Sequence, residues 1–319
     1  MTVASVCVTH NRLAALQKCI AAIRSQTLAV DEIIIVNNGS TDRTCEWVKT
    51  QEDLNVVSQQ NSGSGGGQHS GIKLALGNGH SWIWCMDDDG IPANDALSKL
   101  LQASAKFSSD RVFNSLVIDS DDHSRIAFGY HLAHNVLDKQ RGFRYDKVDD
   151  LNRVTDNFVC DGLAQFFNST LLGREVVERV GLPLPELFIR GDELEYVYRI
   201  QRKGFRTYTV TNSYVFHPNP LIEYWSFFGK RIGYERMSDG KRYYALRNAN
   251  WIDETYWGIR MGILDRAKAV LVAMFGSFVG TGSVSSSLRT GNVALRALRD
   301  ANGLTTVLHA AQGEPVQVI

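Results

Sequence analysis

The chain of 319 residues is poor in cysteine and has no long apolar run. Its five cysteines are odd in number, widely spaced and without a Cys-x-x-Cys pair, which favours buried thiols in a reducing cytoplasm over a disulfide framework or a zinc site. The cysteines are Cys7, Cys19, Cys45, Cys85 and Cys160. The longest apolar run, 269–280, contains Ser277 and two glycines and falls short of the roughly 20 residues that span a bilayer.

The first residues, 1–6, lack the basic segment and the apolar stretch of a signal peptide. We therefore expect a cytoplasmic protein that at most rests on the inner face of the cell membrane. No nucleic-acid partner is expected.

Charge is balanced over the whole chain but not along it. The 34 Lys and Arg residues equal the 34 Asp and Glu residues, yet residues 226–319 hold 12 of the former and 7 of the latter. This excess of five positive charges predicts contact of the tail with anionic lipid head groups or with a diphosphate-bearing acceptor. Solvated helix faces often have the same composition, so the asymmetry alone decides neither way.

Apolar runs alternate with amphipathic stretches in the first 90 residues. Strands are expected at 3–8, 33–36, 56–57 and 81–86. Helices are expected between them: around Leu13 to Ile23, after a cap at Ser40, and from the glycine-rich loop 61–67 to about residue 76. This order predicts an α/β fold with β-α units around a mostly parallel sheet.

The second half of the chain has a less regular pattern. Strand-like segments cover 112–118 and 158–167, the stretch 119–154 between them shows no readable period, and helices are expected at 171–180 and from Asp192 to Gly204. A strand pair at 206–210 and 214–216 then ends in His217. After Pro220 we expect a mainly helical appendage without strands. The predicted domains are therefore 1–220 and 221–319, the second for acceptor or membrane-surface contacts.

Three consecutive carboxylates follow the apolar run 82–86. Asp87, Asp88 and Asp89 would lie at the carboxyl end of a buried strand, where open α/β sheets bind ligands. Like charges this close repel, and a hard cation such as Mg²⁺ or Mn²⁺ can bridge them to substrate phosphates. An acidic turn that merely ends a strand is the alternative.

Polar residues also close the first two strands. Residues 9–12 are suited to hold a nucleotide base and ribose, and the absence there of G-x-G-x-x-G argues against a dinucleotide. The amide of Asn38 is placed to read a pyrimidine edge. Both segments also have ordinary explanations, as a helix cap and as a turn. The glycines of 61–67 let backbone amides approach a phosphate, unless the segment is only a flexible loop.

Two further candidates lie near residue 200. Asp192 and Glu193 begin a helix, where the macrodipole favours carboxylates and where a general base would also fit. His217 ends an apolar strand. A histidine there is often a packed core residue, but a neutral imidazole is also a competent third ligand for Mn²⁺.

Taken in order, five segments resemble the inverting family 2 glycosyltransferases with the GT-A fold. This fold is a Rossmann-like mixed sheet of nucleotide-diphospho-sugar transferases, and the resemblance covers about residues 3–217. The segments are 8–12, 36–42, Asn61 with its glycines, 86–89, and 191–196 with Arg199. No single segment is specific, whereas the series is.

The resemblance implies a role for each matching residue. The predicted nucleotide-sugar contacts are Thr9, Asn11, Arg12, Asn38, Asn61, Gly66, Asp87, Asp88 and Arg247. Asp87 and Asp89 form the D-x-D motif and bind Mn²⁺ or Mg²⁺ together with His217. The family's catalytic base lies six positions before an Arg, and counting back from Arg199 gives Glu193, with Asp192 as the alternative.

Four phrases look most like galactofuranosyltransferases: 61–67, 84–89, 188–193 and 243–248. The donor would then be UDP-galactofuranose, and dTDP-rhamnose if the chain is instead a rhamnosyltransferase, since those enzymes share several phrases. By the same resemblance the acceptor is a glycan or a lipid-linked oligosaccharide of cell-envelope polysaccharide biosynthesis. The motifs specify no oligomeric state.

The implied mechanism is an inverting displacement. A metal ion neutralises the leaving diphosphate while Glu193 deprotonates the acceptor hydroxyl. Two other classes remain. A nucleotidyltransferase would carry a glycine-rich, basic signature after the first strand, which residues 9–12 lack. A non-catalytic carbohydrate-binding protein would bind glycan without any dependence on nucleotide.

Overall fold

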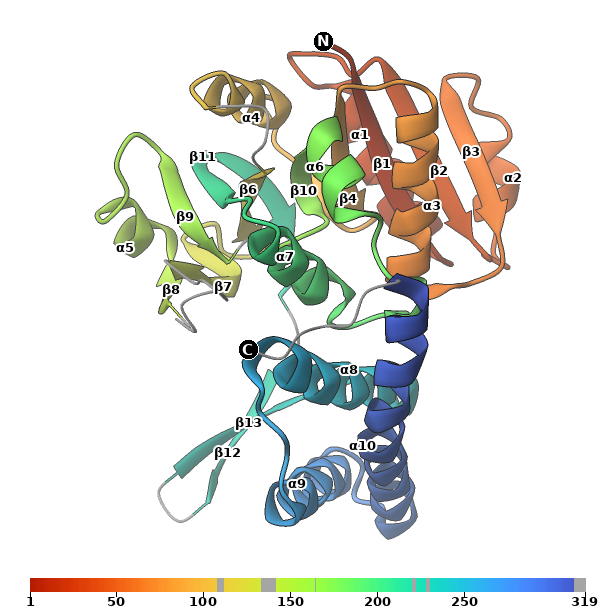
Figure 1. The fold of residues 1–319 in the computed structure, drawn as a ribbon, viewed down its shortest axis with the longest axis vertical. Helices are drawn as coiled ribbons and strands as arrows, with labels where there is room; N and C mark the ends of the chain where they lie inside the picture. Colours follow the sequence, from red (N-terminus) through yellow and green to blue (C-terminus); the bar gives the residue numbers. More distant parts are fainter. Residues whose placement is uncertain (108–111, 133–141, 164, 220–221, 228–229, 313–319) are drawn as a thin grey trace. The chain divides into compact units, whose positions relative to one another are not determined.

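The computed structural model describes residues 1–107, 112–132, 142–163, 165–219, 222–227 and 230–312 (Figure 1). The chain divides into two compact units. The first comprises residues 1–188 and 192–219, and the second comprises 189–191 and 220–319. The expected boundary after residue 220 lies beside this division, while the role expected for the second part stays a prediction.

The first unit is built on a mixed sheet of eleven strands in the order β3-β2-β1-β4-β10-β6-β11-β9-β7-β8, with β5 paired to β11. Its strands are β1 (Val3–Thr9), β2 (Glu32–Asn38), β3 (Leu54–Gln59), β4 (Trp82–Asp87), β5 (Ile91–Pro92), β6 (Val112–Asp119), β7 (Arg125–Leu132), β8 (Phe143–Lys147), β9 (Val159–Leu163), β10 (Asn168–Gly173) and β11 (Thr207–His217). Its helices are α1 (Leu13–Arg24), α2 (Thr44–Val48), α3 (Gly63–Gly77), α4 (Ala96–Ser104), α5 (Val148–Asn152), α6 (Arg174–Val180), the 3-10 turn η1 (Pro185–Leu187) and α7 (Asp192–Arg202). The four strands predicted at the start of the chain, with a helix after each of the first three, are confirmed.

Strand β1 is buried along its whole length because helices cover both faces of the sheet (Figure 1). Val3 and Cys7 belong to the same core cluster as Leu16 of α1. The alternate residues Val6 and Val8 face α3. This arrangement explains why β1 reads as a continuous apolar run rather than as an alternating strand.

The glycine-rich segment is mostly helix and not the expected loop, since α3 begins at Gly63. A Cβ atom on Gly67 would lie 2.3 Å from Val8 Cγ1, and one on Gly71 would lie 2.3 Å from Val6 Cγ1. The glycines therefore let α3 approach β1 more closely than any side chain would permit.

Several other expectations are corrected. Ser40 does not cap α2, because its hydroxyl accepts from the backbone N–H of Asn11 at 3.1 Å. Leu171 lies in β10, so the helix starts only at Arg174. The expected strand pair is one strand, β11, whose register against β6 shifts between Val210 and Tyr214. The unreadable stretch 119–154 contains β7, β8 and α5.

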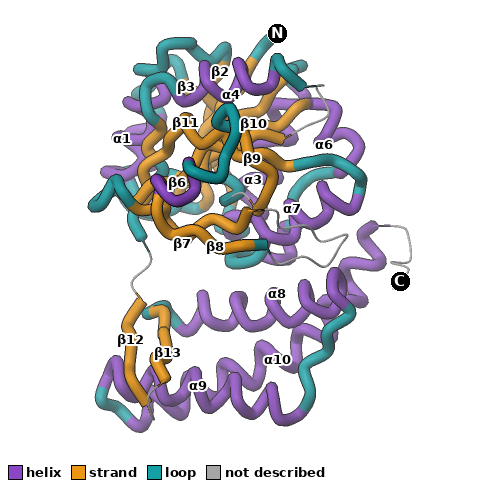
Figure 2. The backbone as a smooth tube through the Cα atoms, turned by 90° about the vertical axis from the view of Figure 1, so that its left-hand side faces the viewer, coloured by secondary structure: helices purple, strands orange, loops and turns teal. Residues whose placement is uncertain are grey.

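The second unit is mainly helical, as predicted, but it also contains a strand pair. Its elements are β12 (Ile222–Phe227), β13 (Lys230–Glu235), α8 (Asp239–Trp257), α9 (Ile263–Thr281) and α10 (Val284–Gln312). The antiparallel hairpin β12–β13 contradicts the expectation of no strands after Pro220. Helix α10 packs along both α8 and α9 (Figure 2). Among the described helices, none is long and apolar enough to cross a membrane.

Candidate functional site

The carboxyl ends of the central strands bring most of the predicted residues to one edge of the sheet. β1 is parallel to β2 and β4, with Val8 opposite Asp87. β10 is antiparallel to both β4 and β6, and β11 is parallel to β6. β11 therefore runs in the same direction as β4, so its last residue, His217, reaches the edge where the three aspartates lie.

The middle aspartate is turned into the protein. Asp88 is buried, and its Oδ2 accepts from Thr9 Oγ1 at 2.7 Å. Arg12 donates to its other oxygen at 3.3 Å. Burial raises the pKa of Asp88, although the hydrogen bond from Thr9 and the charge of Arg12 oppose this change. Thr9 and Arg12 thus hold Asp88, and their predicted nucleotide contacts stay predictions.

Asp89 and His217 form a pair. His217 Nε2 lies 3.1 Å from Asp89 Oδ1, and Arg12 binds Asp89 Oδ2. Burial alone would raise the pKa of Asp89, but His217 and Arg12 hold it well below its usual value. His217 Nδ1 lies 2.7 Å from the carbonyl oxygen of Pro218, which can only accept a hydrogen bond, so Nδ1 carries a proton. In the neutral ring Nε2 is then the nitrogen available to a metal ion.

Asp87 completes the donor set expected for a metal. It is partly buried, and burial followed by the charges of Asp89 and Asp88 raises its pKa well above the usual value. Within the described residues, no three His, Cys, Asp or Glu side chains are already grouped closely enough to hold a metal ion. The chemistry of the set nevertheless fits Mn²⁺ or Mg²⁺, because carboxylates and one imidazole are ligands for hard cations and a cation would relieve the repulsion at Asp87.

The acidic pair at the start of α7 is asymmetric. Asp192 is fully buried, and Ser64 of α3 donates to its Oδ2. Burial, then the charge of Glu193 and a hydrogen bond to it, raise the pKa of Asp192 well above its usual value, with Ser64 opposing. Among the described residues, Oδ1 of Asp192 has no hydrogen-bond partner. Glu193 itself is only partly buried.

Arg199 fixes the helix that carries this pair. Its guanidinium binds both oxygens of the buried Glu195, at 2.9 and 3.0 Å. It also donates to the carbonyl oxygens of Val180 and Leu182 at 3.1 and 3.0 Å. Arg199, six residues after Glu193, thus ties the helix that carries the acidic pair to the end of α6 and the residues that follow it.

The predicted nucleoside residues share a polar network. Asn38 is buried, and its amide accepts from Ser62 N at 3.1 Å and donates to Gly63 O at 2.8 Å. Asn61 Oδ1 accepts from Gly63 N at 3.0 Å. Asn11, at a positive φ of 55°, accepts from Thr41 N at 2.6 Å. These amides tie the strand ends to the start of α3, and their contacts with a nucleotide stay predictions.

Two members of the site were not singled out from the sequence. His10 donates through Nδ1 to Asn38 O at 2.9 Å, and its Nε2 lies 3.3 Å from Asn61 Nδ2. Ser64 was treated only as part of a glycine-rich loop. Because each partner is distant along the chain, only the position of His10 and Ser64 inside matching segments signalled them.

Gly66 and Arg247 are the remaining predicted residues. Gly66 is buried in α3, where a Cβ would lie 2.2 Å from Ser62 Oγ. Arg247 belongs to α8 of the second unit, where it donates to Asn248 Oδ1 at 2.9 Å and lies over the ring of Tyr244 at 4.8 Å. Their roles toward a donor stay predictions.

Comparisons with known proteins identify the family. The profile of Glycosyl transferase family 2 matches residues 5–167. Galactofuranosyltransferase GlfT1 of Mycolicibacterium smegmatis is 30% identical over 257 residues, which cover 78% of this chain and 82% of that protein.

Solved structures are similar at low sequence identity. A structure of GalNAc-T7 with UDP, GalNAc and Mn²⁺ has a TM-score of 0.58 at 16% identity, over 95% of this chain and 54% of that one. The mannosyltransferase PcManGT from Pyrobaculum calidifontis, with GDP-Man and Mn²⁺, has a TM-score of 0.52 at 16% identity, over 98% of this chain and 80% of that one. The first unit therefore has the GT-A fold, and the chain belongs to glycosyl transferase family 2 and is a glycosyltransferase.

Proposed function

We propose that the chain is an inverting, metal-dependent hexosyltransferase that moves galactofuranose from UDP-galactofuranose to a hydroxyl of a glycan or lipid-linked acceptor. The choice of UDP-galactofuranose as donor is supported by the 30% identity to GlfT1 over most of both chains. The acceptor class, in cell-surface polysaccharide synthesis, follows from the same resemblance. That two structures of similar fold hold a nucleotide with Mn²⁺ supports a nucleoside diphosphate donor.

The edge of the sheet supplies the donor side of this mechanism. Asp87, Asp89 and His217 would hold Mn²⁺ or Mg²⁺, which when bound neutralises the charge of the departing diphosphate. Thr9 and Arg12 keep the Asp88 carboxylate inside, so that its two neighbours stay at the surface of the edge. Asn11, Asn38, Asn61, Gly66 and Arg247 are proposed to contact the donor.

Glu193 is proposed as the base. Its carboxylate takes the proton of the acceptor hydroxyl while that oxygen bonds to the anomeric carbon from the face opposite the diphosphate. The bond between the anomeric carbon and the diphosphate oxygen breaks, and the configuration inverts. Burial, followed by the charge of Glu193, raises the pKa of Asp192, which favours the protonated form of Asp192 beside the proposed base. The full burial of Asp192 supports Glu193 as the residue of the pair that meets the acceptor.

The second unit is proposed to meet the acceptor or the membrane surface that presents it. Its excess of positive charge is consistent with anionic head groups. We propose that the protein acts in the cytoplasm at the inner face of the membrane.

A donor panel tests the function. The purified protein is incubated with UDP-galactofuranose, other UDP sugars and dTDP-rhamnose, each with Mn²⁺, and its melting temperature and nucleotide release are measured. A donor that binds the native state raises the melting temperature. We expect UDP-galactofuranose to do so and, once a glycan or lipid-linked acceptor is added, to yield UDP and a product of inverted configuration. Selective response to dTDP-rhamnose, release of pyrophosphate, or glycan binding without any nucleotide effect would contradict the proposal.

A further inference from the structure

The hairpin formed by α9 and α10 exposes a long uncharged apolar surface. From Ala269 to Leu288 the chain has no acidic, basic or histidine side chain. Seven apolar residues of this segment are nevertheless exposed: Leu271, Val272, Phe275, Phe278, Val279, Val284 and Leu288. We name these seven residues the hairpin surface. Contiguous exposed apolar patches on a soluble protein mark interaction sites.

The hairpin surface is distinct from the core-facing side of α9, because another face of this helix is packed inside the protein. Val270 and Ala273 are buried against Ala294 and Leu298 of α10. Gly276 lies so close to Tyr234 that a Cβ there would sit 2.0 Å from the ring. Leu271, Phe275 and Phe278 follow at spacings of four and three, so they share the opposite stripe. The helix is therefore apolar both inward and outward.

Arginines border this surface, beginning near the turn between α9 and α10. Arg236 donates to the carbonyl oxygen of Gly280 at 3.0 Å, next to the turn between the helices. Arg289 follows Leu288 directly, with a side chain 70% exposed while it binds Asp239 at 3.0 Å. Arg296 comes two turns later on α10 and is 69% exposed. The apolar stripe and the guanidinium groups thus occur on one supersecondary unit.

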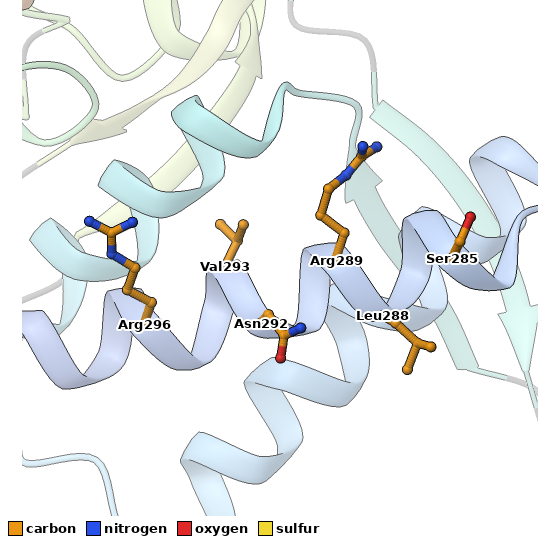
Figure 3. Close-up of a pocket in the computed structure, with 6 residues that line it drawn as sticks. All are labelled: Ser285, Leu288, Arg289, Asn292, Val293 and Arg296. Atoms are coloured by element: carbon orange, nitrogen blue, oxygen red, sulfur yellow. The ribbon is translucent and has the colours of Figure 1, made fainter.

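A groove of about 500 Å³ runs beside them on α10. It is lined by Ser285, Leu288, Arg289, Asn292, Val293 and Arg296 (Figure 3). These residues recur at spacings of three and four, so one helix face combines an apolar floor with two guanidinium groups. Guanidinium beside apolar surface is the chemistry that receives a phosphate joined to an acyl chain.

We propose that the hairpin surface docks on an anionic phospholipid bilayer. The exposed Leu, Val and Phe side chains enter the boundary between head groups and acyl chains, and Arg289 and Arg296 bind lipid phosphates. Charge favours a lipid surface over a second copy of the chain. Helices α9 and α10 carry five Lys and Arg residues against two Asp, so the same helices of two copies would repel each other. An anionic lipid surface complements the same charges.

Flotation with vesicles tests the proposal on the full chain. Vesicles of phosphatidylcholine alone are compared with vesicles that also contain phosphatidylglycerol. We expect binding to the anionic vesicles, weakened by added salt. Phe275→Ser/Phe278→Ser should lower partitioning about tenfold or more, because two aromatic side chains that would be buried in the bilayer are lost. Arg289→Gln/Arg296→Gln should weaken binding only where the lipid is anionic.

The control is Phe143→Ser, since Phe143 is an aromatic residue on β8 of the other unit that is even more exposed than Phe275 and Phe278. It should bind vesicles like the wild type, and all variants should melt like the wild type without vesicles. Failure of the wild type to bind anionic vesicles would overturn the proposal. So would self-association in sedimentation that Phe275→Ser/Phe278→Ser abolishes, because the occupant would then be a second copy. Vesicle binding requires neither donor nor turnover, so it is decided separately from the proposed glycosyl transfer.

Discussion

The hydroxyl of Ser64 donates to Oδ2 of Asp192, so the first turn of α3 holds the first residue of α7. This bond occupies one oxygen of a fully buried carboxyl group, whose other oxygen has no hydrogen-bond partner among the described residues. Two adjacent carboxyl groups thereby receive different environments, one inside the protein and one partly exposed. Environments that separate the protonation of paired carboxyl groups are how active sites divide acid and base roles.

Replacing the two acids should have unequal effects on turnover. Glu193→Gln removes the proton acceptor, so we expect kcat to fall about 10²- to 10⁴-fold. Asp192→Asn retains an acceptor for Ser64 and a donor for Glu193, so we expect kcat to stay within about tenfold of wild type. Release of UDP measures kcat. Donor binding, followed by thermal shift, is the control and should be unchanged in both variants. Equal loss in the two variants would transfer the role of base to Asp192.

The difference in stability between Asp192→Asn and the wild type should depend on pH. Because the pKa of Asp192 is raised in the folded protein, folding retains a proton that the unfolded chain releases near its usual pKa of about 3.9. The wild type therefore loses stability from this group as pH rises above that value. The variant has no such group, so its melting temperature should exceed that of wild type by more at about pH 8 than at about pH 5. The measurement is made with chelator present, and a difference independent of pH would show that Asp192 is ionised in the fold.

Metal binding should depend on Asp89 and His217. We expect EDTA to abolish turnover and Mn²⁺ to restore it. We also expect Asp89→Asn and His217→Gln each to weaken Mn²⁺ binding with UDP about 100-fold or more, since changes even outside the ligand set cost 10- to 100-fold. Calorimetric titration measures the affinity. Asp95→Asn is the control, because Asp95 pairs with Lys99 at the start of α4. Full turnover without divalent cation would refute the metal site.

Much of this edge could be predicted because β1, β2 and β4 are apolar runs that end in polar residues. Parallel strands bring such ends together, and the Val8–Asp87 register is that outcome. His217 was predicted as a possible third metal ligand from its position at a strand end, and the resemblance to a family assigned it to the metal site. The Ser64–Asp192 bond could not be predicted, because its partners are 128 residues apart and Ser64 stands among glycines.

Low burial explains why the sequence did not reveal one of the strands. β8 has no fully buried residue, so no apolar alternation marks it. β11 contains a register shift that broke its pattern into two apparent strands. The contacts of Arg199 could not be predicted either, because Val180 and Leu182 bind it through backbone carbonyl oxygens, which every residue has.

Arg199 should be important for stability. Arg199→Met leaves Glu195 buried without its cation, and removal of one partner of a buried pair costs about 3–5 kcal/mol. We expect a correspondingly lower midpoint of unfolding in urea. Arg24→Met is the matched control, because its pair with Asp53 is exposed and should contribute less than about 1 kcal/mol. Similar losses in the two variants would mean that Arg199 does not hold α7.

Two glycines of the same helix should respond to alanine in opposite directions. A Cβ on Gly67 would lie 2.3 Å from Val8 Cγ1, so Gly67→Ala must push α3 off β1 and should cost about 1–3 kcal/mol of unfolding free energy. Gly77 ends the same helix with no atom within 4 Å of such a Cβ. Gly77→Ala should therefore stabilise by about 0.5–1 kcal/mol through the lower entropy of the unfolded chain. Urea unfolding measures both, and a neutral Gly67→Ala would show that close packing of α3 on β1 is not what requires the glycines. Because Ser64 stands on the first turn of α3, a displaced helix should also weaken the hold on Asp192, so Gly67→Ala should lower kcat while Gly77→Ala leaves it unchanged.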